Sequence, residues 1–160
     1  MDDEAIRYQL RGRGALSNHD GRFEHHQHVA QSDGWDLDAD EPLPVLRTQV
    51  SEELPRRMIT YNQSPDLPFD RSINPYRGCE HGCVYCFARP THAYLGLSPG
   101  LDFETRLVAR PEAPNVLRRE LGTRKYKVAP IAIGTNTDPY QPIELKREIV
   151  RDCLQVLREV

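Results

Sequence analysis

Three cysteines lie close together in this chain, Cys79, Cys83 and Cys86, at the spacing C-x3-C-x2-C. Thiolates are soft anionic ligands that suit iron–sulfur clusters and zinc. Three of them in one loop can each bind one iron of a cubic cluster. Because no fourth cysteine lies nearby, the remaining iron would stay open to a ligand that is not protein, as a catalytic cluster requires. We therefore predict that these three cysteines are metal ligands.

A zinc site is the alternative for the same loop, with His81 or His92 as the fourth ligand. Zinc motifs more often pair one C-x2-C unit with a distant second pair of ligands. The fourth cysteine, Cys153, stands alone in a helical pattern. We predict that it packs in the core, because a buried free cysteine behaves as a small hydrophobe. Cysteines clustered in this way do not indicate a disulfide framework.

A second polar segment, residues 134–144, follows a short apolar run and precedes a helical pattern. Ligands of α/β proteins bind beyond the carboxyl ends of the strands. The segment is rich in hydroxyl, amide and carboxylate groups, which can bind both an ammonium and a carboxylate. It is the second candidate ligand site. Turn and helix-capping chemistry is the alternative, because Asn, Thr and Asp are good caps.

The elements that must position these residues indicate an α/β domain. Residues 1–45 lack apolar periodicity and are predicted to be a low-order acidic extension, whereas residues 46–160 form the domain. Strands are predicted to end at Ser72–Asn74 and to cover Phe103–Val108 and Val128–Gly134, the last covered on both faces. Helices are predicted at Ala88–Leu95, from Pro114 to Leu121, and from Pro142 onward. The last helix would bury one apolar stripe: Ile149, Val150, Cys153, Leu154 and Leu157.

Composition and charge restrict the classes of function. The chain has 160 residues, of which 38% are hydrophobic and 28% charged, and its net charge is −3. No apolar run approaches the ~20 residues of a membrane span, and the N-terminus is acidic, unlike a secretory signal. We therefore expect a cytoplasmic protein without a membrane segment. Residues 71–127 carry ten basic and five acidic side chains. Such a segment suits an anionic cofactor or substrate, or is simply a solvated face, and does not by itself establish a nucleic-acid partner.

The residues around the cysteines, Ser72 to Cys79 and Cys86 to Tyr94, resemble the radical S-adenosylmethionine superfamily. The resemblance is closest to its spore photoproduct lyase-like branch, runs from about Arg11 to the C-terminus, and is strong at 71–104 and 131–144. It implies the N-terminal portion of a (β/α)6 partial TIM barrel. The chain supplies about two of the six strand–helix units, so we expect a C-terminally truncated protein.

The resemblance also implies a chemistry. A [4Fe-4S] cluster on the three cysteines would bind S-adenosyl-L-methionine at its open iron, and cleavage of this cofactor would give a 5′-deoxyadenosyl radical that abstracts hydrogen from a substrate. A flavodoxin or ferredoxin would donate the electron. The substrate is not assigned. Two alternatives stay open: a non-catalytic cluster-binding fragment and a zinc-binding interaction module.

Further cofactor contacts follow from position relative to the family pattern. By resemblance, the residues that would bind the methionine amino group are Thr135, Asn136, Thr137 and Asp138. Tyr85 and Phe87 flank the last cysteine and would pack beside the adenine or shield the cluster, with core packing as the alternative. Arg89, His92 and Tyr94 are polar groups that would support the loop or reach substrate, or have no functional role.

Overall fold

The computed structural model describes residues 12–25 and 46–159. Most of the predicted acidic extension therefore lies outside the described residues. The elements in chain order are β1 (Gln49–Glu52), β2 (Thr60–Tyr61), β3 (Arg71–Ile73), β4 (Tyr76–Arg77), the 3₁₀-helix η2 (Arg89–Leu95), α1 (Leu101–Thr105), β5 (Arg106–Ala109), α2 (Ala113–Leu121), β6 (Ala132–Ile133), α3 (Glu144–Arg147) and α4 (Ile149–Arg158).

The strands form two small sheets of three strands each. In the first, β5 lies between β1, which is parallel to it, and β4, which is antiparallel. In the second, β3 lies between the antiparallel β2 and the parallel β6, with Ile73 opposite Ile133. The described residues thus form a mixed α/β structure without a closed barrel. The (β/α)6 partial barrel that the resemblance implies stays a prediction.

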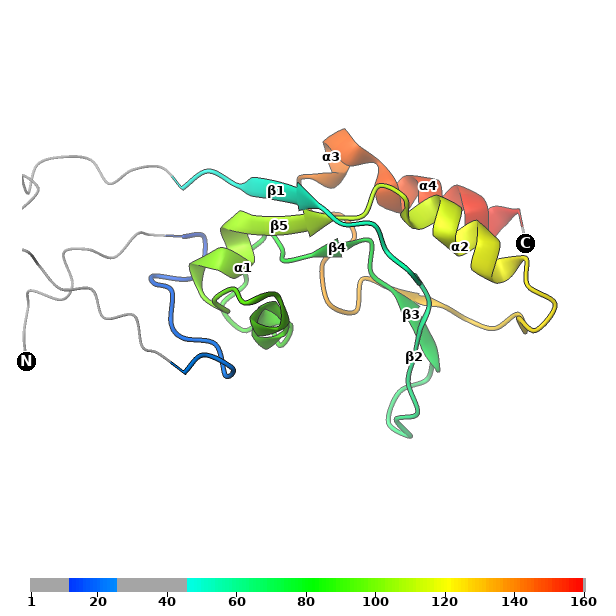
Figure 1. Ribbon diagram of the computed structural model, residues 1–160, viewed down its shortest axis with the longest axis horizontal. Coiled ribbons are helices and arrows are strands. Elements are labelled where there is room, and N and C mark those ends of the chain that lie inside the picture. Colours follow the sequence, from blue (N-terminus) through cyan, green and yellow to red (C-terminus); the bar gives the residue numbers. More distant parts are fainter. Residues whose placement is uncertain (1–11, 26–45, 160) are drawn as a thin grey trace, which may run out of the picture.

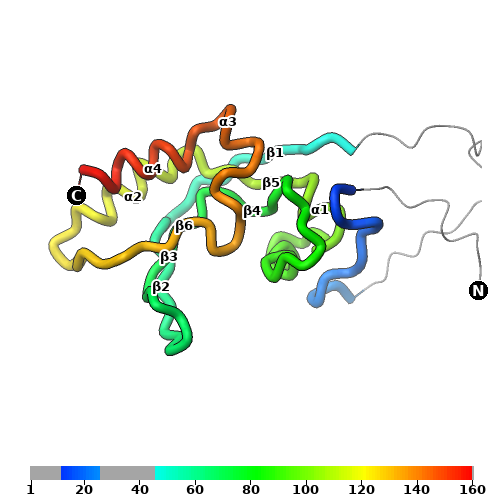
Figure 2. Tube along the Cα trace, turned by 180° about the vertical axis from the view of Figure 1, so that it is seen from behind, coloured from blue at the N-terminus to red at the C-terminus, as the bar shows by residue number. Residues whose placement is uncertain are grey.

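The main hydrophobic core lies where α2 and α4 pack side by side near one end of the molecule (Figures 1 and 2). Helix α2 buries Ala113, Val116, Leu117 and Leu121, which recur at the helical period and so form one face. A smaller cluster of Cys79, Ala88 and Phe103 lies toward the other end and packs against Cys86. The cysteine loop therefore has a hydrophobic support of its own.

Several predicted elements are confirmed. Strand β3 ends within one residue of the predicted position, and α2 covers the helix expected between Pro114 and Leu121. The helix expected at Ala88–Leu95 is present as the 3₁₀-helix η2, and Gly96 ends it in the left-handed conformation with φ 67°. The two helices have strong local signals, which are a proline near the start and a glycine at the end.

The predicted strand Phe103–Val108 is wrong in its first half. Residues up to Thr105 form α1, and the strand begins only at Arg106. Tertiary contacts explain the difference, because the Phe103 carbonyl accepts a hydrogen bond from the Cys79 N–H at 2.9 Å and the Glu104 side chain is fully buried. An alternating apolar pattern does not report such contacts.

The two C-terminal predictions also need correction. Strand β6 covers only Ala132–Ile133, and its side chains are half-buried because it lies at the edge of its sheet. The single final helix is broken at Glu148, which adopts φ 51° and separates α3 from α4. On α4 the core-facing side includes Val156, which was not in the predicted stripe, and Leu157, which packs against the core as predicted. Leu154 is 42% exposed and so does not belong to the stripe.

Candidate functional site

The cysteine loop, residues 78–88, joins β4 to η2 through successive turns. The Gly82 N–H donates to the Cys79 carbonyl at 3.3 Å, and the Cys86 N–H donates to the Cys83 carbonyl at 3.2 Å. Gly78 and Gly82 adopt φ 75° and 61°, a region that disfavours residues with a Cβ atom. The two glycines therefore allow the tight path that carries all three cysteines within one loop.

The three thiols have different surroundings. Cys79 is buried, Cys86 is half-buried and Cys83 is exposed, and all are free. Burial raises the pKa of Cys79, while hydrogen bonds to its sulfur from the backbone N–H groups of Asp138 and His81 act in the opposite direction. Within residues 12–25 and 46–159, no three Cys, His, Asp or Glu side chains are gathered as a metal-binding group. The three sulfurs share a loop without converging on one point.

The histidines proposed for a zinc site have other partners. His81 Nε2 lies 3.5 Å from Asp138 Oδ2. His92 is buried, with Nε2 at 2.9 Å from the Arg106 carbonyl and its ring edge against Phe103, and burial lowers its pKa. His92 thus supports the core beneath the loop.

The second polar segment lies directly beside the cysteine loop. Strands β3 and β6 are parallel, so their carboxyl ends meet, and Asn74 after β3 binds both Thr135 Oγ1 at 3.0 Å and the Asn136 N–H at 2.8 Å. Gln141, which is fully buried, accepts from the Glu80 N–H at 3.1 Å and donates to the Gly78 carbonyl at 3.4 Å. The two candidate segments, far apart in sequence, therefore form one surface.

The predicted cofactor residues of this segment differ in role. The Asp138 carboxylate accepts from the Tyr140 N–H at 2.8 Å, which is the turn chemistry considered as the alternative. Asn136 is exposed, and Thr137 is buried. The sequence does not single out Gln141 as a site residue, and its position within the same polar segment is the one signal that could have indicated it. Asn74 and Gln141 are the amide side chains that join the two segments.

Tyr85 and Phe87 point away from the core. Tyr85 is 85% exposed and Phe87 is 80% exposed, and Val84 beside them is 70% exposed. Core packing, the alternative considered for the two aromatics, is therefore wrong. Their contact with a cofactor stays a prediction, since exposed aromatic rings offer a face for stacking.

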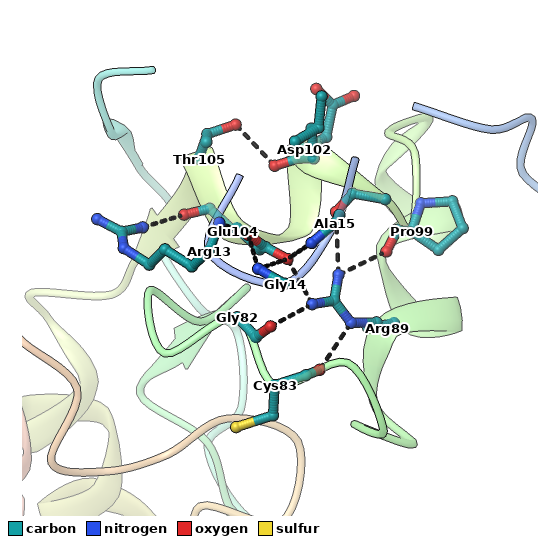
Figure 3. Close-up of polar contacts among 12 residues, drawn as sticks. Arg13, Gly14, Ala15, Gly82, Cys83, Arg89, Pro99, Asp102, Glu104 and Thr105 are labelled. Carbon is teal, nitrogen blue, oxygen red and sulfur yellow. Dashed lines mark hydrogen bonds and ion pairs between the residues drawn. The ribbon is translucent and has the colours of Figure 1, made fainter. Parts of the chain in front are cut away.

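A buried carboxylate fastens the N-terminal segment to the cysteine loop (Figure 3). The Glu104 cluster consists of Arg13, Gly14, Ala15, Arg89 and Glu104. The Glu104 carboxylate accepts from the backbone N–H groups of Arg13 at 2.6 Å, Gly14 at 3.1 Å and Ala15 at 2.7 Å, and from the Arg89 guanidinium. Figures 1 and 2 show this N-terminal stretch alongside α1. Sequence reasoning did not identify Glu104, because no local pattern marks a carboxylate that binds residues ninety positions away.

Arg89 connects that cluster to the cysteines. Its guanidinium donates to the carbonyl oxygens of Gly82 at 2.7 Å and Cys83 at 2.9 Å, and it lies over the Phe103 ring. Arg89 therefore holds the backbone of the loop and does not reach into open space. Tyr94, the other polar residue considered near the loop, is exposed and stacks at a tilt on Phe23.

Cys153 is confirmed as a core residue. It is fully buried on α4, and burial raises the pKa of its thiol to about 12. Cys153 therefore packs as a small hydrophobe, away from the cysteine loop.

Comparison with known proteins leaves the family open. No family model matches the chain, and no solved structure matches it. Over 78 residues the chain is 53% identical to uncharacterised proteins of Mycobacterium tuberculosis (Rv2578c) and Mycobacterium bovis (Mb2609c). The match covers 49% of this chain and 23% of each relative. The chain thus spans about a quarter of the length of the curated relatives it matches.

The described part of the chain contains no helix that is long and apolar enough to cross a membrane.

Proposed function

We propose that this chain is part of a radical S-adenosylmethionine protein of the spore photoproduct lyase-like branch, with a [4Fe-4S] cluster bound by Cys79, Cys83 and Cys86. The observation that carries the proposal is the C-x3-C-x2-C loop together with the polar segment that packs against it. The flanking sequence resembles that superfamily.

The donor set fits such a cluster. Three thiols on one loop can bind three irons, and the backbone N–H groups of Asp138 and His81 at the Cys79 sulfur are of the kind that adjust the reduction potential of a cluster. Binding of three irons would require the side chains of the exposed Cys83 and the half-buried Cys86 to turn toward Cys79. When bound, the cluster supplies the electron that cleaves S-adenosyl-L-methionine to a 5′-deoxyadenosyl radical.

The chain's own residues would position the cofactor. The hydroxyl and amide groups at Thr135–Thr137 lie at the carboxyl end of β6, beside the loop, where they can accept from an ammonium group. Tyr85 and Phe87 are exposed on the loop and can cover an adenine ring. Arg89 and Glu104 keep the loop in place through backbone contacts.

Anaerobic reconstitution tests the proposal. The full chain, incubated with iron and sulfide without oxygen, should take up about four irons and four sulfides, and then form 5′-deoxyadenosine from S-adenosyl-L-methionine when reduced. Cys79→Ser, Cys83→Ser and Cys86→Ser should each lose the cluster signal in absorption and electron paramagnetic resonance spectra. Cys153→Ser is the matched control and should keep it.

The outcomes separate the alternatives. A loaded cluster without cofactor cleavage supports the non-catalytic fragment. One equivalent of zinc without iron or sulfide supports the interaction module and overturns the proposal. Failure of the intact thiols to take up either iron or sulfide overturns it as well.

A further inference from the structure

A polar cavity of about 360 Å³ lies next to the cysteine loop. It falls within the range typical of ligand sites, roughly 300–1,000 Å³. Its walls come from β4, from η2 and from the residues after β3 and β6, so it adjoins both candidate segments. None of the described residues that line it is a cysteine, an aspartate or a glutamate.

The cavity carries an excess of positive charge. Arg57, Arg77 and Arg110 line it. Among the described residues, Glu53 is the one carboxylate that pairs with any of them, at 3.1 Å from Arg110 and 3.7 Å from Arg77. Arg57 has no hydrogen bond or ion pair within the described ranges. Three guanidinium groups with one carboxylate leave a net charge that a bound anion would offset.

Arg110 is held in place as well as charged. Its guanidinium donates to the Asn74 carbonyl at 3.1 Å and to Glu53, its side chain is 13% exposed, and burial lowers its pKa. Removing a charged group from water costs free energy unless other charges compensate for it. A planar guanidinium fixed in this way is suited to bind a carboxylate or phosphate through two parallel hydrogen bonds.

A buried hydroxyl on the same wall has no partner. Thr137 lines the cavity and is 5% exposed, and within the described part of the chain its Oγ1 makes no hydrogen bond. Buried polar atoms are almost always hydrogen-bonded, so each exception calls for a physical reason. A ligand oxygen bound in the cavity would supply the missing partner.

We propose that this arginine cavity, lined by Arg57, Arg77, Arg110 and Thr137, binds an oxyanion of the substrate, either a phosphate or a carboxylate. The assignment to a substrate rests on the proposed function. In that function the amino and carboxylate groups of S-adenosyl-L-methionine bind the open iron at the cysteines, and Asn136 and Thr137, which also line the cavity, contact the ammonium. The three arginines are given no part in binding the cofactor, so we assign the anion that they bind to a second molecule, and competition with S-adenosyl-L-methionine tests this assignment.

Binding of inorganic phosphate to the iron-free full chain tests the cavity without the cluster. Titration calorimetry, at constant ionic strength set with chloride, should show phosphate binding that Arg57→Gln and Thr137→Val each weaken about tenfold. Arg151→Gln is the matched control, because Arg151 pairs with Glu148 away from this cavity. Titration with acetate tests whether the cavity binds a carboxylate. Comparison of adenosine 5′-monophosphate with adenosine separates recognition of the phosphate from recognition of the nucleoside.

Thr137→Val gives a second, independent readout. If the hydroxyl is unpaired without ligand, valine should raise the melting temperature of the iron-free chain while it weakens phosphate binding. A purely structural threonine would lower the melting temperature, which contradicts the proposal. Equal binding by Arg57→Gln and the wild type also overturns it.

Competition separates the sources of the anion. If S-adenosyl-L-methionine displaces phosphate from the iron-free chain, the cavity is a cofactor site and the assignment to a substrate is wrong. If phosphate binds as expected but no cluster forms on reconstitution, the anion site is supported and only the radical chemistry fails.

Discussion

Two charged regions flank the cysteine loop, and they differ in how completely their charges are paired. In the Glu104 cluster, three backbone N–H groups and one guanidinium surround a fully buried carboxylate. In the arginine cavity, one carboxylate pairs with two of the three guanidinium groups, and the hydroxyl of Thr137 has no partner among the described residues. The first region is complete as it stands, whereas the second has unused hydrogen-bonding capacity.

This difference assigns the two regions different roles. A buried charge with all its partners present holds segments together, because removing any partner leaves an uncompensated charge. Partly exposed guanidinium groups in excess cost stability through mutual repulsion and are useful when a ligand neutralises them. The Glu104 cluster therefore positions the loop, and the arginine cavity receives a ligand.

The largest effect should come from the paired region. Glu104→Gln removes the charge that faces Arg89 and places an amide N–H₂ among groups that are all donors. We expect a loss of about 3 kcal/mol in the free energy of unfolding, measured by urea denaturation. Glu112→Gln is the control, since within the described part of the chain this exposed carboxylate accepts a hydrogen bond only from the Asn115 amide, and it should change little. Equal effects of the two variants would contradict the structural role of the cluster.

A smaller effect should follow when the N-terminal segment is pushed away from the loop. A Cβ atom on Gly14 would lie 1.9 Å from the Gly82 carbonyl oxygen, which is backbone and cannot easily move. Gly14→Ala should therefore destabilise the chain by about 1–3 kcal/mol and speed tryptic cleavage at Arg13. Gly122→Ala, at a helical φ of −73°, is the control and should leave cleavage unchanged. Unaltered proteolysis of the first variant would show that the segment is not docked on the loop.

The smallest effect on stability should come from the cavity. Arg57 is exposed and makes no ion pair within the described ranges, so Arg57→Gln should change the free energy of unfolding by less than about 0.5 kcal/mol. The same variant should nevertheless bind phosphate about tenfold more weakly than the wild type. A large loss of stability would mean that Arg57 is a structural residue and would remove the contrast between the two regions.

The sequence predicted elements well where the signals are local. Pro114 and Gly122 bound α2, Gly96 ends η2, and β3 ends directly before Asn74. It failed where distant contacts decide the structure. Thr105 ends a helix that buries Glu104, which binds backbone groups ninety residues earlier in the chain. Neither the two-residue period of a strand nor the 3.6-residue period of a helix reports contacts between residues so far apart in the sequence.

The same holds for the candidate site. The types and spacing of Cys79, Cys83 and Cys86 are covalent facts of the chain, and they alone define three sulfur ligands on one loop. The sequence also shows that residues 134–144 are polar and follow an apolar run. The parallel pairing of β3 with β6 decides which groups contact this segment, because it brings Asn74 to Thr135 and Asn136. The excess of arginine over carboxylate in one cavity likewise depends on tertiary structure, because charge compensation is set by distance in space and not by separation along the chain.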